Sequence, residues 1–314
     1  MSACPKLISL ALASLFLILF TANHLVSSHS AESNTFPTCQ DQDEDIVRVN
    51  TELVVVNVTV LDGNGKFVSG LRRSDFQILE DGKEQKISSF GAEETPFAAA
   101  ILLDTSGSME SRLTIGRSAA IRFLDGLREE DVAAVYSFDT RVERWGDFSP
   151  GRDLPARVYS LKTKTFTALN DAILRAADDL ARREEKRRAI VVLSDGGENY
   201  SRASSDKALD HASAAGATIY AANMAELGPR RDISAAAILR NLTEKSGGRY
   251  IDSPGGLELR DAFAAIAEEL GHQYTIAYRP TNRAKDGKWR AIDVKLARPN
   301  VTVRARKGYR AAKA

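Results

Sequence analysis

The chain is poor in the residues that enzyme active sites use most. Its 314 residues include only four histidines and two cysteines. It has no H-E-x-x-H pair for zinc and no glycine-rich P-loop. The G-x-S-x-G turn of serine hydrolases is also absent, because Asp104 stands where its first glycine would precede Ser106. We therefore do not expect an enzyme.

An excess of charge of one sign is missing as well. The sequence has 43 basic and 42 acidic residues, a formal net charge of +1. This balance provides no bulk attraction for nucleic acid, so we expect no nucleic-acid partner. With 43% hydrophobic residues, the chain is long enough for one large domain and a smaller one.

The longest apolar run lies near the N-terminus, at Leu7–Phe20, and small residues follow it. This pattern predicts a secretory signal over residues 1–30, cleaved after Ser30, and therefore a secreted, periplasmic or cell-envelope location. An uncleaved membrane anchor is the alternative, because the run is near the lower limit for spanning a bilayer. Residues 31–45 are polar and acid-rich, which is typical of a linker. Cys39, the one cysteine left after cleavage, has no partner for an intramolecular disulfide.

Residues 94–273 alternate between apolar runs and segments of helical periodicity. Such alternation predicts an α/β domain with a doubly wound, mostly parallel sheet covered by helices on both faces. The expected strands are 97–103, 132–138, 189–194, 217–223 and 249–251, with an edge strand at 142–148. The expected helices are 111–127, 152–161, 168–184, 204–215, 231–246 and 257–271.

The segments on either side, 46–93 and 274–314, show the two-residue alternation of β-strands. The four valines at even positions from Val54 to Val60 share one face, and the other face carries Asn57 and Thr59, which predicts a half-buried strand. Neither segment has enough strands to be stable alone. We expect the two to form one β-sandwich; two separate hairpins on the surface of the central domain are the alternative. Further strands are expected in 77–90, as a hairpin, and at 274–278, 289–296 and 301–305.

The most informative stretch follows the apolar strand Ala98–Leu103. Asp104, Ser106 and Ser108 come directly after it, in the loop at the carboxyl end where open α/β sheets place their ligand sites. One carboxylate and two hydroxyls at this spacing can converge on a hard cation. Taken alone, Asp104 is also a strand-end acid that caps a helix beginning near Ser111.

The D-x-S-x-S pattern resembles the metal-ion-dependent adhesion site of von Willebrand factor type A domains. The resemblance implies that Thr167, in TFTALNDAI, and Asp195, in AIVVLSDGGEN, join Asp104, Ser106 and Ser108 around the metal. Thr165 is a rival for the threonine position, and Thr167 alone is also an ordinary helix N-cap.

The flanking segments resemble an exported bacterial family related to von Willebrand factor A, in EDGKEQKISSF, YTIAYRP and DGKWRAIDVKL. A site with few charged ligands keeps an open coordination position. If Asp104 is the only direct carboxylate, with Asp195 acting through water as the resemblance suggests, a carboxylate of a partner protein or other acidic ligand could complete the coordination. We therefore expect an exported, metal-dependent binding module that uses Mg²⁺, with Ca²⁺ or Mn²⁺ as alternatives. Membrane contact is expected only if the N-terminal segment is retained. A structural subunit of an envelope assembly and a metal-dependent hydrolase are the competing hypotheses.

Overall fold

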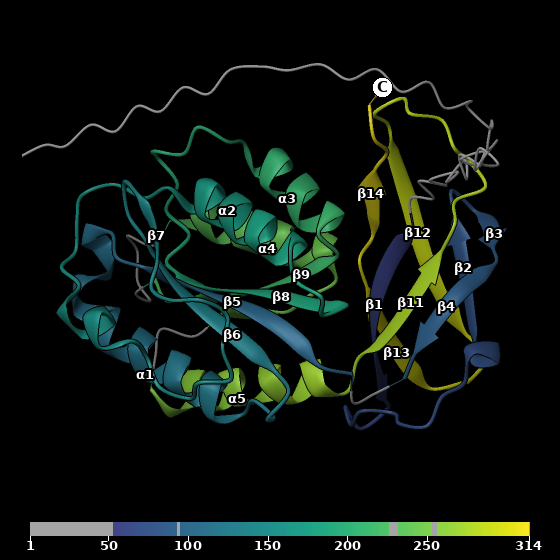
Figure 1. Ribbon diagram of the computed structural model, residues 1–314, viewed down its shortest axis with the longest axis horizontal. Helices are drawn as coiled ribbons and strands as arrows, with labels where there is room; N and C mark the ends of the chain where they lie inside the picture. Colours follow the sequence, from purple (N-terminus) through teal and green to yellow (C-terminus); the bar gives the residue numbers. More distant parts are fainter. Residues whose placement is uncertain (1–52, 93–94, 226–231, 253–255, 314) are drawn as a thin grey trace, which may run out of the picture. The chain divides into compact units, whose positions relative to one another are not determined.

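Figure 1 shows a computed structural model of the chain, which describes residues 53–92, 95–225, 232–252 and 256–313. The central part is a six-stranded sheet with strand order β10-β9-β8-β5-β6-β7. All neighbours are parallel except β7, which is antiparallel to β6. The strands are β5 (Phe97–Asp104), β6 (Val132–Phe138), β7 (Val142–Arg144), β8 (Arg187–Ser194), β9 (Ala217–Asn223) and β10 (Tyr250–Asp252).

Helices cover both faces of this sheet. In Figure 1, α1 and α5 lie on one face and α2, α3 and α4 lie on the other. The helices are α1 (Leu113–Asp125), α2 (Leu169–Ala181), α3 (Ser205–Ala214), α4 (Ile233–Ser246) and α5 (Leu257–Gly271). The described part of the chain also contains the short 3-10 helices η1 (Arg73–Asp75), η2 (Gly107–Arg112) and η3 (Ala156–Ser160). The predicted fold class is confirmed for the central domain.

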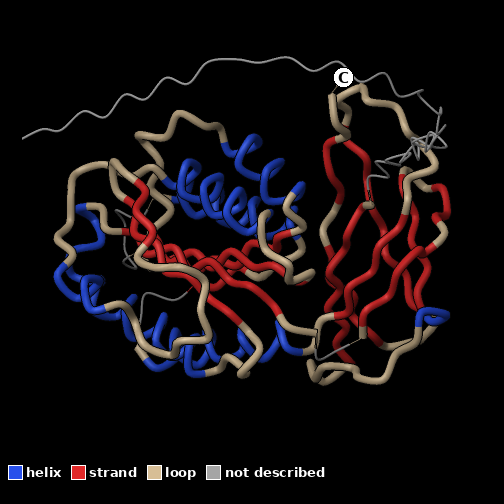
Figure 2. Tube along the Cα trace, in the orientation of Figure 1, coloured by secondary structure: helices blue, strands red, loops and turns tan. Residues whose placement is uncertain are grey.

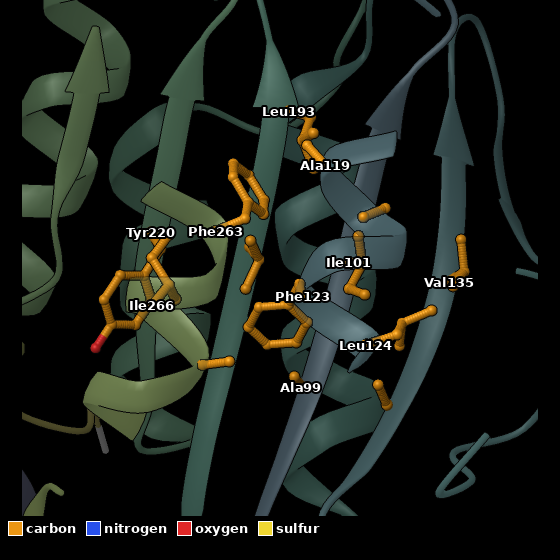
Figure 3. Close-up of a cluster of buried hydrophobic side chains, with 14 of the residues drawn as sticks. Ala99, Ile101, Ala119, Phe123, Leu124, Val135, Leu193, Tyr220, Phe263 and Ile266 are labelled. Carbon is orange, nitrogen blue, oxygen red and sulfur yellow. The ribbon is translucent and has the colours of Figure 1, made fainter. Parts of the chain in front are cut away.

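Strand β5 lies at the centre of the sheet and is buried along its whole length. On the side of α1 and α5, Ile101 packs in one cluster with Phe123 of α1 and Phe263 of α5 (Figure 3). Alternate residues of the same strand, such as Leu102, face a second cluster with α2, α3 and α4. A strand enclosed on both faces needs a continuous apolar sequence, which explains the run from Phe97 onwards.

The remaining strands form two antiparallel sheets, of strand order β13-β1-β11-β4 and β14-β12-β2-β3 (red in Figure 2). Their bounds are β1 (Val54–Asp62), β2 (Phe76–Glu80), β3 (Lys83–Gln85), β4 (Ile87–Gly91), β11 (Tyr274–Tyr278), β12 (Trp289–Leu296), β13 (Val301–Ala305) and β14 (Gly308–Arg310). Each sheet combines strands from both ends of the chain, and the two share one hydrophobic core. The predicted β-sandwich is therefore confirmed, and the alternative of two separate hairpins is wrong.

The expected half-buried state of β1 is wrong. The four valines of its even face are at most 6% exposed, but Asn57 and Thr59 on the other face are buried too. The Asn57 amide donates to the carbonyl of Gly216, and the Thr59 hydroxyl donates to Glu269 of α5. Hydrogen bonds to the α/β part thus replace the water that a polar strand face would otherwise contact.

The segment after β6 also differs from the prediction. The expected edge strand 142–148 is shortened to β7, because Gly146 interrupts it with φ of 134°. The expected helix 152–161 is only the 3-10 helix η3, whose N-cap is Pro155. Proline favours an extended conformation for the residue before it and has no N–H to donate. A regular helix that begins at residue 152 is therefore interrupted at Pro155.

The predicted signal segment 1–30 and linker 31–45 lie outside the described residues. Within the residues that are described, no helix is both long enough and apolar enough to cross a membrane.

Candidate metal centre

Asp104 is the last residue of β5 and is 1% exposed. Its Oδ1 accepts a hydrogen bond from the backbone N–H of Ser106 at 2.8 Å, and its Oδ2 accepts one from the Ser194 hydroxyl at 2.5 Å. The hydroxyl oxygens of Ser106 and Ser108 lie 3.1 Å apart. Because each carboxylate oxygen has two lone pairs, these bonds leave Asp104 able to accept a further partner.

The loop that carries Thr167 lies against the Asp104 loop. Ser106 forms an isolated parallel β-bridge with Lys164, whose N–H donates to the carbonyl of Thr105 at 2.9 Å. The approach is close: a β-carbon on Gly107 would lie 3.4 Å from the Lys164 carbonyl oxygen. Thr167 itself is 3% exposed, whereas the rival Thr165 is exposed.

The third loop joins the same region after β8. The N–H of Gly197 donates to Asp195 Oδ1 at 3.0 Å. A β-carbon on Gly197 would lie 3.1 Å from Asp195 Oδ1 and 3.6 Å from Thr167 Oγ1, so both oxygens lie beside this glycine. Asn199 and Thr167 also exchange two hydrogen bonds, from Asn199 N–H to the Thr167 carbonyl and from Thr167 N–H to Asn199 Oδ1. The structure thus brings all three predicted loops together.

Neither helix-capping alternative is found. The N-cap of α2 is Ala168 rather than Thr167, and the N-cap of α1 is Arg112, so Asp104 caps neither helix. Thr167 therefore has no capping role that would account for its position.

Several residues that hold the site were missed in the sequence. Glu198 accepts hydrogen bonds from the backbone N–H groups of Asn170, Tyr200 and Ser201 and from the Ser201 hydroxyl. It thereby ties the Asp195 loop to the first turn of α2. Ser194 links Asp104 to the same loop, because its hydroxyl also accepts from Gly196 N–H at 2.9 Å. Glu198 stands in the quoted motif SDGGEN, but nothing in that pattern distinguishes it from a surface acid.

The charge of Asp104 is poorly compensated by the protein alone. The pKa of Asp104 is raised to about 7, and burial is the largest cause. The nearby negative charge of Asp195 also raises this pKa, whereas hydrogen bonds from Ser106 and Ser194 lower it. A divalent cation would offset both effects. Carboxylate and hydroxyl oxygens are ligands that Mg²⁺ and Ca²⁺ prefer, so the donor set fits a hard cation. The described residues contain no group of three or more His, Cys, Asp or Glu side chains that could hold a metal, so such a site depends on hydroxyls.

Residues 99–198 match the family model of the von Willebrand factor type A domain. The chain contains a von Willebrand factor type A (VWA) domain. The matched range includes all five candidate residues. VWA domains generally serve as adhesion or protein-interaction modules.

Similarity to known proteins is otherwise modest. Inter-alpha-trypsin inhibitor heavy chain H3 of Rattus norvegicus is 28% identical over an alignment of 157 residues that covers 41% of this chain and 18% of that protein. A von Willebrand factor type A structure from Catenulispora acidiphila is 13% identical, with 85% of this chain and 75% of that chain covered and a TM-score of 0.44. An aerotolerance-related membrane protein from Bacteroides fragilis NCTC 9343 is 20% identical, with 56% and 98% covered and a TM-score of 0.45.

Proposed function

We propose that this VWA domain is a metal-dependent binding module. A divalent cation, Mg²⁺ first and Ca²⁺ or Mn²⁺ as alternatives, would be held by the oxygens of five residues: Asp104, Ser106, Ser108, Thr167 and Asp195. A carboxylate of a partner protein or another acidic ligand would complete the coordination. The cation's contribution is to attract and hold that carboxylate.

The observation that carries this proposal is the convergence of three loops on a buried, uncompensated carboxylate. Asp104 is buried and its pKa is raised, which is unfavourable unless a positive charge lies close by. Ser108, in contrast, is exposed, so the same loop also reaches solvent, where a ligand can approach. A buried carboxylate next to an exposed serine supports a site that binds a metal ion and then a partner.

The competing hydrolase hypothesis receives less support. Both histidines within the described residues are engaged elsewhere: His211 lies 2.8 Å from Asp178 of α2, and His272 stacks on Phe67. A general base for water activation is therefore not supplied by either histidine.

The proposal is tested by calorimetric titration of MgCl₂ into the wild type and Asp104→Asn. We expect the variant to lose at least about tenfold in affinity, since it keeps the volume but removes the charge. Mg²⁺ should raise the Tm of the wild type and not that of the variant. Asp261→Asn, an exposed change on α5, is the matched control. Equal Mg²⁺ affinity in Asp104→Asn and the wild type would contradict the proposal.

We also propose that the protein is exported to the cell envelope or beyond it. The support is the apolar run Leu7–Phe20 followed by small residues. Mass spectrometry of the N-terminus after cell fractionation checks this, with a mature chain beginning after Ser30 as the expected result. A cytoplasmic protein that retains Met1 would contradict it.

A further inference from the structure

Two exposed aromatic side chains lie on the loops around the candidate metal centre. Phe166 and Tyr200 are 45% and 52% exposed. Phe166 directly precedes Thr167, and the N–H of Tyr200 donates to the Thr167 carbonyl at 3.1 Å. Both side chains are thus next to the threonine of the proposed site.

Phe166 and Tyr200 form a stacked pair, with ring centroids 5.4 Å apart and ring planes inclined by 23°. We call these two residues the aromatic pair. The backbone beside each ring is held by hydrogen bonds of the Thr167 and Glu198 loops, so the pair is presented on a fixed support. Aromatic side chains in such positions are enriched at the energetic centres of protein interfaces.

A basic hollow includes Lys164, which stands two residues before Phe166. This hollow of about 510 Å³ is lined by four basic and two acidic residues: Arg141, Arg157, Lys162, Lys164, Asp139 and Glu143. Lys164 pairs with Asp139 at 3.0 Å and forms the β-bridge with Ser106. The hollow therefore borders the candidate centre through Lys164. Its surplus of positive charge is complementary to an acidic partner.

We propose that the partner is a protein segment in which the metal-bound Asp or Glu stands next to an aromatic or large aliphatic side chain, within an acidic stretch. The aromatic pair contacts that apolar side chain, and the basic hollow attracts the neighbouring acidic residues. This inference depends on the proposed function, because it places the partner's carboxylate at the metal. What it adds is the kind of residue that flanks this carboxylate in the partner's sequence.

The test is selection of displayed random linear peptides on the full chain in MgCl₂, with a parallel selection in EDTA. The targets are the wild type, the double variant Phe166→Ala/Tyr200→Ala, and the control Leu257→Ala. Leu257 is 71% exposed and begins α5. Thermal unfolding of each variant verifies that it is folded. Peptides selected on the wild type are then synthesised and their affinities measured.

We expect the wild type and the control to enrich Asp or Glu beside an apolar side chain in MgCl₂ only. The double variant should keep the acidic preference, lose the apolar one, and bind the selected peptides about tenfold more weakly. Acidic enrichment without an apolar neighbour, or an unchanged affinity in the double variant, would overturn the inference and leave the proposed function intact. Selection without acidic enrichment, or equal selection in EDTA, would overturn both.

Discussion

Replacing Glu198 by alanine tests how the candidate centre is held together. The Glu198 carboxylate accepts four hydrogen bonds, three from backbone N–H groups and one from the Ser201 hydroxyl, at 2.7–3.2 Å. One of these donors is Asn170 N–H in the first turn of α2, where a negative charge also interacts favourably with the helix dipole. Alanine removes all of these contacts at once.

The expected loss of stability follows from these bonds. A hydrogen bond to a charged group contributes about 1.5–3 kcal/mol, but Glu198 is partly exposed and water replaces part of the loss. Glu198 is not the N-cap residue of α2, but it accepts a first-turn N–H as an N-cap side chain does, and losing such an acceptor costs about 0.5–2 kcal/mol. We therefore expect the free energy of unfolding to fall by about 2–3 kcal/mol, which lowers the Tm by roughly 4–10 °C in a chain of this size.

Circular dichroism during heating measures the Tm, and calorimetry measures Mg²⁺ affinity. Glu198→Ala should weaken Mg²⁺ binding as well, because the Thr167 and Asp195 loops lose a shared anchor. Glu198→Gln keeps an acceptor oxygen and should fall between the wild type and alanine. Glu244→Ala, an exposed change on α4, should stay within about 0.5 kcal/mol. A Tm of Glu198→Ala within about 1 °C of the wild type would refute the reasoning.

Two further predictions concern the framework of the central domain. Gly248→Ala places a β-carbon onto the carbonyl group of Ile219 in β9. We therefore expect the free energy of unfolding, measured by urea denaturation, to fall by about 3 kcal/mol. A urea midpoint equal to that of the wild type would show that the backbone moves freely there. Hydrogen bonds from the Arg183 guanidinium hold the pKa of Glu185 below its usual 4.5. The stability that the Arg183–Glu185 ion pair contributes is therefore present above a pH of 4.5 and is lost as the pH falls through the lower pKa of the folded state. Glu185→Gln should flatten the fall of Tm between about pH 5 and about pH 3, and an unchanged slope would contradict this.

Elements with a strong periodic pattern were predicted well. The unbroken apolar run from Phe97 identifies β5 as a strand enclosed on both faces, because no amphipathic element has that composition. The alternating valines of β1 likewise identify the face that packs into the sandwich core. Both patterns report burial of residues close together in the sequence.

The errors at β1 and at Glu198 have a common physical origin in contacts between distant segments. Asn57 and Thr59 are polar, yet they are buried because Gly216 and Glu269 provide their hydrogen-bond partners. The sequence of β1 contains no information on those partners. The importance of Glu198 was missed for the same reason, since its carboxylate acts on Asn170, 28 positions away.

By itself the sequence determined the α/β order of the central domain, the two flanking β-segments and the oxygen-rich loop Asp104–Ser108, because each is encoded by neighbouring residues. The resemblance implied that the loops of Asp104, Thr167 and Asp195 meet, but only the tertiary structure decided that they do and that Asp104 is buried among them. The Ser194 hydroxyl that reaches Asp104 comes from 90 positions away. Such proximity arises when parallel strands bring their carboxyl ends to one edge of a sheet, which no local pattern specifies.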